Sequence, residues 1–239
     1  IRIMPPNFNK MIKKETNSKF DIDIDNIFGS SILSGAFKSM SAKSTSFGYN
    51  GIYMSDFSVN TICPYNYVSF KGGKLSFPEN MVLKYNTTIS QSDIDKILGS
   101  EIYKKAISKM NKDSSISSLV NIKSSSIKIS NNKLNFKYSL TPFPKMSGIF
   151  SALTSSIKPI DLSFSTNIRA NNGKLELCNF DINSKNIAYD ALPIINKFNP
   201  LSYGINVGKN AKGTLDVQNV NIKDNKIQLN GYLVISKNE

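Results

Sequence analysis

A ten-residue phrase that occurs four times along the chain constrains the fold more than any other feature. Each copy has apolar residues two positions apart, then two residues drawn from Gly, Asn and Asp, then Lys and a second alternating run. Alternation places apolar side chains on one face of a strand, and the central pair tolerates the positive φ of a tight turn. The copies are residues 68–77, 127–136, 168–177 and 220–229. The repeat predicts antiparallel hairpins that together build a long sheet with one apolar face.

The composition is that of an ordinary globular protein. The chain has 239 residues, of which 40% are hydrophobic and 20% charged, so it can bury a substantial core. Its longest stretch without Asp, Glu, Lys or Arg is residues 57–70, 14 residues, which is shorter than the roughly 20 that a membrane-spanning helix needs. The chain begins at Ile1 rather than Met, and we therefore expect that a leader or anchor has been removed.

The net charge of +13 raises the question of a nucleic-acid partner. Arg2 and Arg169 are the only arginines, and the lysines are mostly scattered singly. Recognition of bases and phosphates relies on the planar fork of arginine, so we predict no nucleic-acid partner. A solvated basic surface is the simpler interpretation, and attraction to an anionic membrane surface stays open.

The segments between the repeats predict helices and further strands. Residues 20–25 and 81–89 alternate as strands, and Ser90 to Asp93 resembles a capping box that opens a helix over 92–110, which Gly99 interrupts at some cost. Further helices are expected at 145–157 and 190–198. We predict an α+β fold in which a long curved antiparallel sheet of repeated hairpins wraps on two or three helices. Residues 1–19 would form an arm or short helix, and residues 20–239 a single domain.

Catalytic and metal sites find little support. The absence of histidine excludes Ser-His-Asp and Cys-His triads and any His-ligated metal. The aspartates of residues 21–25 resemble the start of an EF-hand loop, but Asn26 replaces its glycine and Ile32 its glutamate. We predict no catalytic residue, no metal and no cofactor, and so no enzyme. Cys63 and Cys178 could form one disulfide or remain two small buried hydrophobic residues.

The candidate site consists of apolar stripes on the two longer predicted helices. Such stripes ordinarily pack against a sheet and bind nothing. Alternatively, the curved sheet and its helices enclose a tubular apolar cavity for acyl chains, with lysines at its mouth for a phosphate headgroup. The candidate cavity residues are Ile94, Ile97, Leu98, Ile102, Met146, Ile149, Phe150 and Leu153.

Three segments carry a resemblance to a known family. They are SGAFKSMSA at 34–42, GIYMSDF at 51–57 and ISQSDIDKIL at 89–98. With the hairpins in the same order, the chain resembles, over most of residues 20–236, the LmeA-like phospholipid-binding family of bacterial envelope proteins. The resemblance implies a secreted or periplasmic lipid-binding protein with a tubular lipid-binding-like fold. More loosely, the hairpins resemble segments of AsmA-type lipid-transport proteins.

Three functions follow as hypotheses. The first is an extracytoplasmic, non-enzymatic carrier or sensor of phospholipid or another acyl-chain ligand. The second is a structural or adhesive envelope module whose sheet faces pack only on each other, in which case exposed aromatic residues such as Tyr49, Tyr53 and Tyr65 would cluster on one surface. The third is a nucleic-acid or polyanion binder, for which binding would weaken steeply with salt. The sequence leaves the oligomeric state open.

Overall fold

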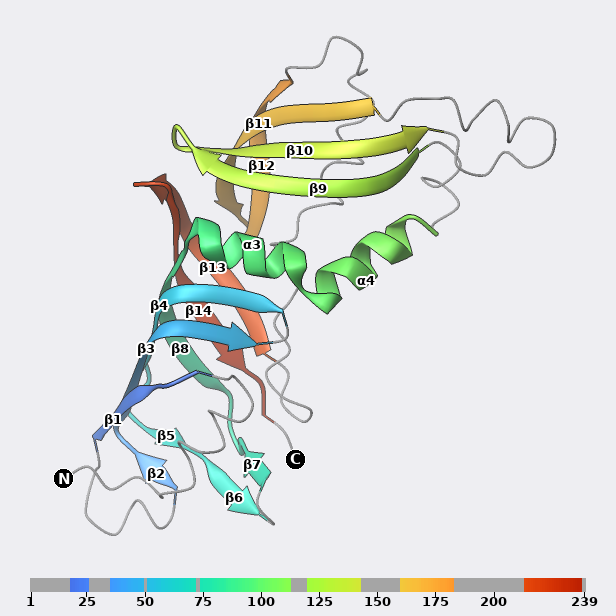
Figure 1. Ribbon diagram of the computed structural model, residues 1–239. Helices are drawn as coiled ribbons and strands as arrows, with labels where there is room; N and C mark the ends of the chain where they lie inside the picture. Colours follow the sequence, from blue (N-terminus) through green and yellow to red (C-terminus); the bar gives the residue numbers. More distant parts are fainter. Residues whose placement is uncertain are drawn as a thin grey trace.

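Two main antiparallel sheets form the body of the protein (Figure 1). The computed structural model describes residues 18–25, 35–49, 51–71, 74–112, 120–142, 160–182 and 213–237. The six-stranded sheet contains, in spatial order, β1 (Asp21–Asp25), β3 (Ser39–Tyr49), β4 (Ile52–Thr61), β8 (Met81–Ile89), β14 (Lys226–Ile235) and β13 (Gly213–Lys223). The four-stranded sheet contains β12 (Lys174–Ile182), β11 (Ile160–Asn171), β10 (Lys133–Pro142) and β9 (Val120–Ser130). Two-stranded sheets join β2 (Ala36–Phe37) to β5 (Asn66–Tyr67), and β6 (Ser69–Lys71) to β7 (Lys74–Ser76).

Each repeated phrase lies in one antiparallel strand pair. In chain order the pairs are β6–β7, β9–β10, β11–β12 and β13–β14. In the last three pairs both turn residues have positive φ, as a type I′ turn requires. These turn residues are Asn131 and Asn132, Asn172 and Gly173, and Asp224 and Asn225. The Asn, Asp and Gly pairs of the sequence therefore determine where the chain reverses.

The two sheets meet where the β11–β12 turn reaches the edge strand β13. The Val217 N–H donates to the Gly173 carbonyl at 2.9 Å, which is the isolated bridge between these strands. The φ of Gly173 is +74°, in the left-handed region that favours glycine, and a Cβ there would also meet Oδ1 of Asp216. The single long sheet predicted from the repeats is therefore divided in two, because a hairpin turn rather than a full strand lies beside β13.

A single hydrophobic core includes residues of both sheets. In the six-stranded sheet, Ala42, Val59 and Tyr85 lie opposite one another on β3, β4 and β8 and share one buried face. In the four-stranded sheet the rings of Phe136 and Phe164 stack with centroids 4.9 Å apart. Alternation along the strands, interrupted by register shifts in several pairs, thus gives each sheet one apolar face.

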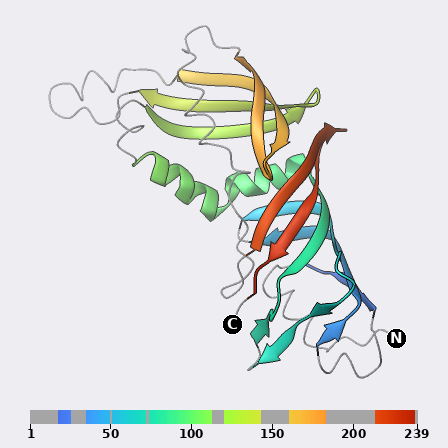
Figure 2. The same ribbon diagram turned by 180° about the vertical axis from the view of Figure 1, so that it is seen from behind.

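The two described helices, α3 (Gln91–Gly99) and α4 (Glu101–Met110), follow β8. Figures 1 and 2 show α3 between the two sheets and α4 continuing beside β9; α3 contacts β4 and β9. Neither helix is long and apolar enough to cross a membrane. The structure is an antiparallel, β-rich α+β fold, and β1 and β8 confirm the strands predicted at 20–25 and 81–89. The helices predicted at 145–157 and 190–198, and residues 1–17 of the predicted arm, lie outside the described residues.

Candidate functional site

The predicted cavity residues that the structure describes lie along α3 and the start of α4. Ile94 is 5% exposed and Ile97 is 9% exposed, so both belong to the interior. Leu98 is half-buried against the core, whereas Ile102 is 47% exposed. The stripe therefore runs from the interior to the surface. The other four predicted residues, Met146, Ile149, Phe150 and Leu153, lie outside the described residues.

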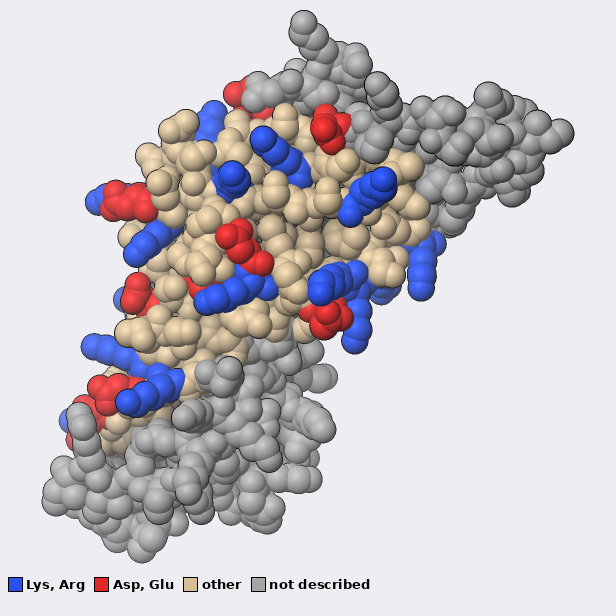
Figure 3. Space-filling model, in the orientation of Figure 1, with Lys and Arg blue, Asp and Glu red and all other residues tan. Residues whose placement is uncertain are grey.

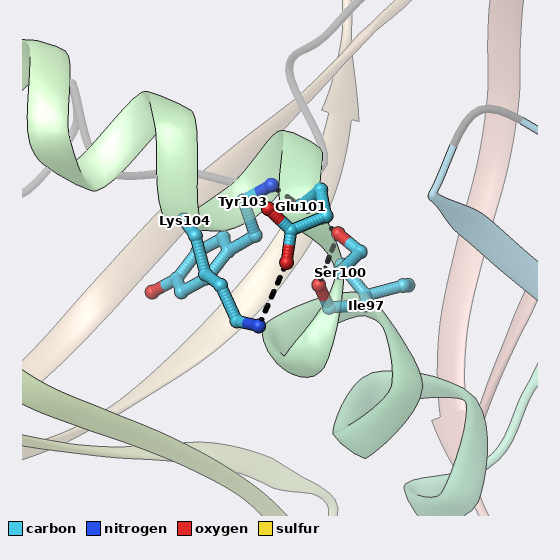
Figure 4. Close-up of polar contacts among 5 residues, drawn as sticks. All are labelled: Ile97, Ser100, Glu101, Tyr103 and Lys104. Carbon is cyan, nitrogen blue, oxygen red and sulfur yellow. Dashed lines mark hydrogen bonds and ion pairs between the residues drawn. The ribbon is translucent and has the colours of Figure 1, made fainter.

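A break at Ser100 divides the helix that the sequence predicts as continuous over 92–110 (Figure 4). The Ser100 hydroxyl donates to the Ile97 carbonyl at 2.7 Å and accepts the Tyr103 N–H at 3.2 Å. One serine thus ends α3 and caps α4. The prediction of one helix is wrong here because Gly99 is a poor helix former and serine competes for backbone hydrogen bonds.

Asp93 anchors α3 to the six-stranded sheet. Its carboxylate accepts hydrogen bonds from the Ser90 N–H at 2.9 Å, the Ser90 hydroxyl at 2.6 Å and the Ser55 hydroxyl of β4 at 2.7 Å. The predicted capping box is therefore confirmed, and it also reaches a neighbouring strand. Burial alone would raise the pKa of Asp93, but the three hydrogen bonds, with a contribution from Lys96, outweigh burial and hold it below its usual value.

The side chain of Gln91 anchors the same helix to the other sheet. Its amide NH₂ donates to the Ile127 carbonyl at 2.8 Å, and its amide oxygen accepts the Ile129 N–H at 2.9 Å. Both partners are backbone groups of β9, the edge strand of the four-stranded sheet. The first turn of α3 is thus hydrogen-bonded to both sheets.

The far end of α4 repeats this arrangement on the same edge. Asn111 accepts the Ile122 N–H at 2.9 Å and donates to the Ile122 carbonyl at 3.1 Å. Between the two ends, the Tyr103 hydroxyl lies 2.8 Å from the Ser125 hydroxyl. These contacts, from Gln91 through Tyr103 to Asn111, are called the edge bracket below. No signal in the sequence marks these residues as partners of a strand.

The interior beneath the six-stranded sheet is closely packed and apolar. Tyr85 is 1% exposed, and its hydroxyl has no hydrogen-bond partner in the structure. Burial, with a smaller contribution from the charge of Asp216, raises the pKa of the Tyr85 phenol far above its usual value. Opposite Tyr85 lies Gly231, where a Cβ would collide with the Asp216 carbonyl. This packing leaves the Tyr85 phenol neutral.

On the face shown in Figure 3, lysines are spread over the described surface with acidic groups between them. On α4 the balance is more one-sided. Lys104, Lys105 and Lys109 are exposed, and the single acid, Glu101, bonds to the Lys104 ammonium at 2.9 Å. That hydrogen bond and the charge of Lys104 lower the pKa of Glu101. The helix that carries Ile102 therefore has a net positive outer face.

Within the described ranges, no group of three or more Cys, Asp or Glu side chains could hold a metal ion. Cys63 and Cys178 are both half-buried free thiols, so the open question of a disulfide is answered in favour of two separate cysteines. The alternation of β1 places its aspartates at the surface around buried Ile22, as expected for a half-exposed strand.

Comparison of the chain with protein-family models, with curated proteins and with solved structures found no match. Its class therefore rests on its own architecture, which is an antiparallel, β-rich α+β protein with two short helices between its two main sheets.

Proposed function

We propose that this protein is a non-enzymatic, extracytoplasmic binder or carrier of phospholipid or another acyl-chain ligand. The ligand's acyl chain would contact the apolar stripe of α3 and α4, with the headgroup toward the lysines of α4. The resemblance of residues 34–42, 51–57 and 89–98 to phospholipid-binding envelope proteins supports the same class of ligand. We further propose that the two sheets function as one long curved surface wrapped on helices.

The fall in burial along the α3–α4 stripe carries this proposal. Ile94 and Ile97 are buried, Leu98 is half-buried, and Ile102 is about half exposed. On α4 itself Ile107 packs against the core but is only half-buried, and Ala106 is half-buried as well. An apolar stripe that opens gradually to solvent suits an acyl chain, because the chain would bury surface that the fold leaves exposed.

A second candidate is a structural or adhesive module with a filled core. Two observations favour it. The core residues of both sheets are buried, and Ile62, Tyr65 and Tyr67 are exposed within six residues of one another, at 51%, 71% and 39%. Of the three tyrosines named for this hypothesis, Tyr65 is exposed and Tyr53 is half-buried. Exposed aromatic side chains are common anchors in protein interfaces.

Lipid that purifies with residues 1–239 tests the first candidate. Native mass spectrometry should detect a bound phospholipid, and a fluorescent phospholipid should transfer from vesicles to the protein. Ile102→Ser should weaken uptake about tenfold, because full burial of an isoleucine is worth about 1.5–3 kcal/mol. Ile62→Ser is the matched control, since Ile62 has nearly the same exposure, 51% against 47%, and lies far along the chain from α4.

Two results would contradict the proposal. One is a wild-type protein that neither carries lipid after purification nor takes it up from vesicles. The other is an equal loss of uptake in Ile102→Ser and Ile62→Ser. Either result would leave the structural module as the better-supported function.

A further inference from the structure

The outer face of α4 combines an exposed apolar side chain with lysines. At about 100° per residue, Ile102, Lys105 and Lys109 fall on one flank of the helix. All three are exposed, and Lys112, just after the helix, is exposed as well. Glu101, the one acidic residue of α4, forms an ion pair with Lys104, and the charge of Lys105 also lowers its pKa, so Lys105 is partly balanced. The flank with Ile102 is therefore apolar and basic.

The edge bracket fixes the rotation of this helix. Tyr103 contacts Ser125 of β9, and Asn111 bonds both backbone groups of Ile122. Ile107 is half-buried against the core. Because these contacts hold α4 against the sheet edge, Ile102 stays at the surface.

We propose that this face of α4, formed by Ile102, Lys105, Lys109 and Lys112, docks on a lipid bilayer that contains anionic phospholipid. Charge complementarity carries the choice of partner. Four described lysines follow Glu101 between residues 104 and 112 with no further acid, and β9 exposes Lys123 next to Ile122, the partner of Asn111. An isoleucine between ammonium groups can enter the headgroup region while the lysines contact lipid phosphates.

A bilayer fits this face better than a nucleic acid does. Ile102 would gain nothing on a phosphate backbone, and α4 contains no arginine to form paired hydrogen bonds with phosphates or bases. One isoleucine and a few lysines give weak, reversible binding that weakens as salt screens the charges. Docking needs no acyl chain inside the protein, so bilayer binding and lipid carriage can fail separately.

Co-sedimentation of residues 1–239 with vesicles tests the inference. The protein should bind vesicles of phosphatidylcholine mixed with phosphatidylglycerol and should not bind phosphatidylcholine alone. Lys105→Gln with Lys109→Gln should weaken binding by roughly 25-fold, since each lysine near an anionic surface contributes about five-fold. The matched control is Lys223→Gln with Lys226→Gln, which removes two exposed lysines beside the β13–β14 turn.

The inference is overturned if the two double variants bind the mixed vesicles equally, or if wild-type protein does not distinguish the two kinds of vesicle. Equal or tighter binding to a single-stranded oligonucleotide at the same salt concentration would also overturn it, in favour of a general polyanion surface. Circular dichroism of each variant verifies that the fold is retained. Native mass spectrometry of the wild-type protein separates the two proposals. Vesicle binding without co-purified lipid supports docking alone, and co-purified lipid without vesicle binding supports carriage alone.

Discussion

Removing the Gln91 side chain should separate α3 from the edge of the four-stranded sheet. In Gln91→Ala the Ile127 carbonyl and the Ile129 N–H lose the partners that now lie 2.8 Å and 2.9 Å away. The two groups belong to an edge strand, so no other strand can replace the amide.

The expected loss follows from these two hydrogen bonds. Each neutral hydrogen bond contributes about 0.5–1.5 kcal/mol net, so the pair is worth about 1–3 kcal/mol. Alanine is the better helix former, which offsets a few tenths of a kcal/mol of this loss in the free energy of unfolding. Gln91 is half-buried, so water can reach part of the vacated site, and the middle of the range, about 2 kcal/mol, is the best estimate.

Urea unfolding followed by far-UV circular dichroism measures the effect, since the chain contains no tryptophan to follow. Ser92→Ala, at the next and exposed position of α3, is the control and should change the free energy of unfolding by less than about 0.5 kcal/mol. In Gln91→Ala, hydrogen exchange at the Ile129 amide should also be faster than in wild type.

Gln91→Glu adds a test with a defined pH dependence. The carboxylate keeps an acceptor for the Ile129 N–H but faces the Ile127 carbonyl and the Asp95 carboxylate, which now accepts from the same amide at 2.9 Å. Its pKa should be raised in the folded state, so the variant should be least stable near neutral pH and recover toward wild type below about pH 4. The reasoning is refuted if Gln91→Ala and Ser92→Ala have the same stability and the same Ile129 exchange rate.

Three further predictions concern the interior and the caps. Asp93→Asn should lower the free energy of unfolding by about 1–3 kcal/mol at neutral pH, because a charged acceptor of three hydrogen bonds becomes neutral. Folding lowers the pKa of Asp93, so its stabilisation is present above the pKa of the unfolded state and is lost as the pH falls through the pKa of the folded state. The stability of the variant should therefore change less with pH than that of the wild type below about pH 4. Gly231→Ala should lower the melting temperature, since the new Cβ would collide with the backbone of Asp216. Gly99→Ala, whose Cβ would have nothing within 4 Å, should raise the free energy of unfolding by about 0.5–1 kcal/mol. A change of stability in the same direction for both variants would contradict this packing. Tyr85→Phe removes a buried hydroxyl that has no hydrogen-bond partner, so it should raise the free energy of unfolding in urea by about 1 kcal/mol. A fall in the free energy of unfolding by more than about 1 kcal/mol would instead reveal a partner for the hydroxyl.

The hairpins could be predicted because their determinants are local. Turn dipeptides such as Asn131-Asn132 and Asp224-Asn225 adopt positive φ with little strain, and each lies between alternating runs. The chain likewise reverses between β3 and β4, where Tyr49 pairs with Ile52. In each case a few adjacent residues decide the outcome.

The division into two sheets could not be predicted, because it depends on contacts distant in the sequence. β8 pairs with β14, so Ile89 lies opposite Ile227 near the other end of the chain. The boundary between the sheets depends on Gly173 meeting Val217. Alternation specifies which face of a strand is apolar, but it does not specify which strand lies next to it.

The candidate site was predictable only in part, because its local features have signals in the sequence and its long-range contacts have none. Helical spacing identified the stripe through Ile94 and Ile97, and the capping box marked its start. The break at Ser100 had a visible signal in the Gly99-Ser100 pair, which the apolar periodicity on either side outweighed. Gln91 and Asn111 had no such signal, since an amide that bonds a strand 36 or 11 residues later looks like any surface amide.

The edge bracket explains why α4 presents a basic, partly apolar face at all. An open edge strand such as β9 invites pairing with another chain, and proteins block such edges with charges or with a covering element. β1, at the edge of the six-stranded sheet, carries exposed aspartates, whereas β9 is covered by side chains of α3 and α4. Asn111 bonds both the N–H and the carbonyl of Ile122, as an antiparallel neighbour would. Covering the edge in this way requires α4 to lie along β9 in one orientation. Its inward side is then occupied by the edge bracket, which leaves the α4 lysines at the surface and Ile102 47% exposed beside the β3–β4 turn, on the face proposed to meet a bilayer.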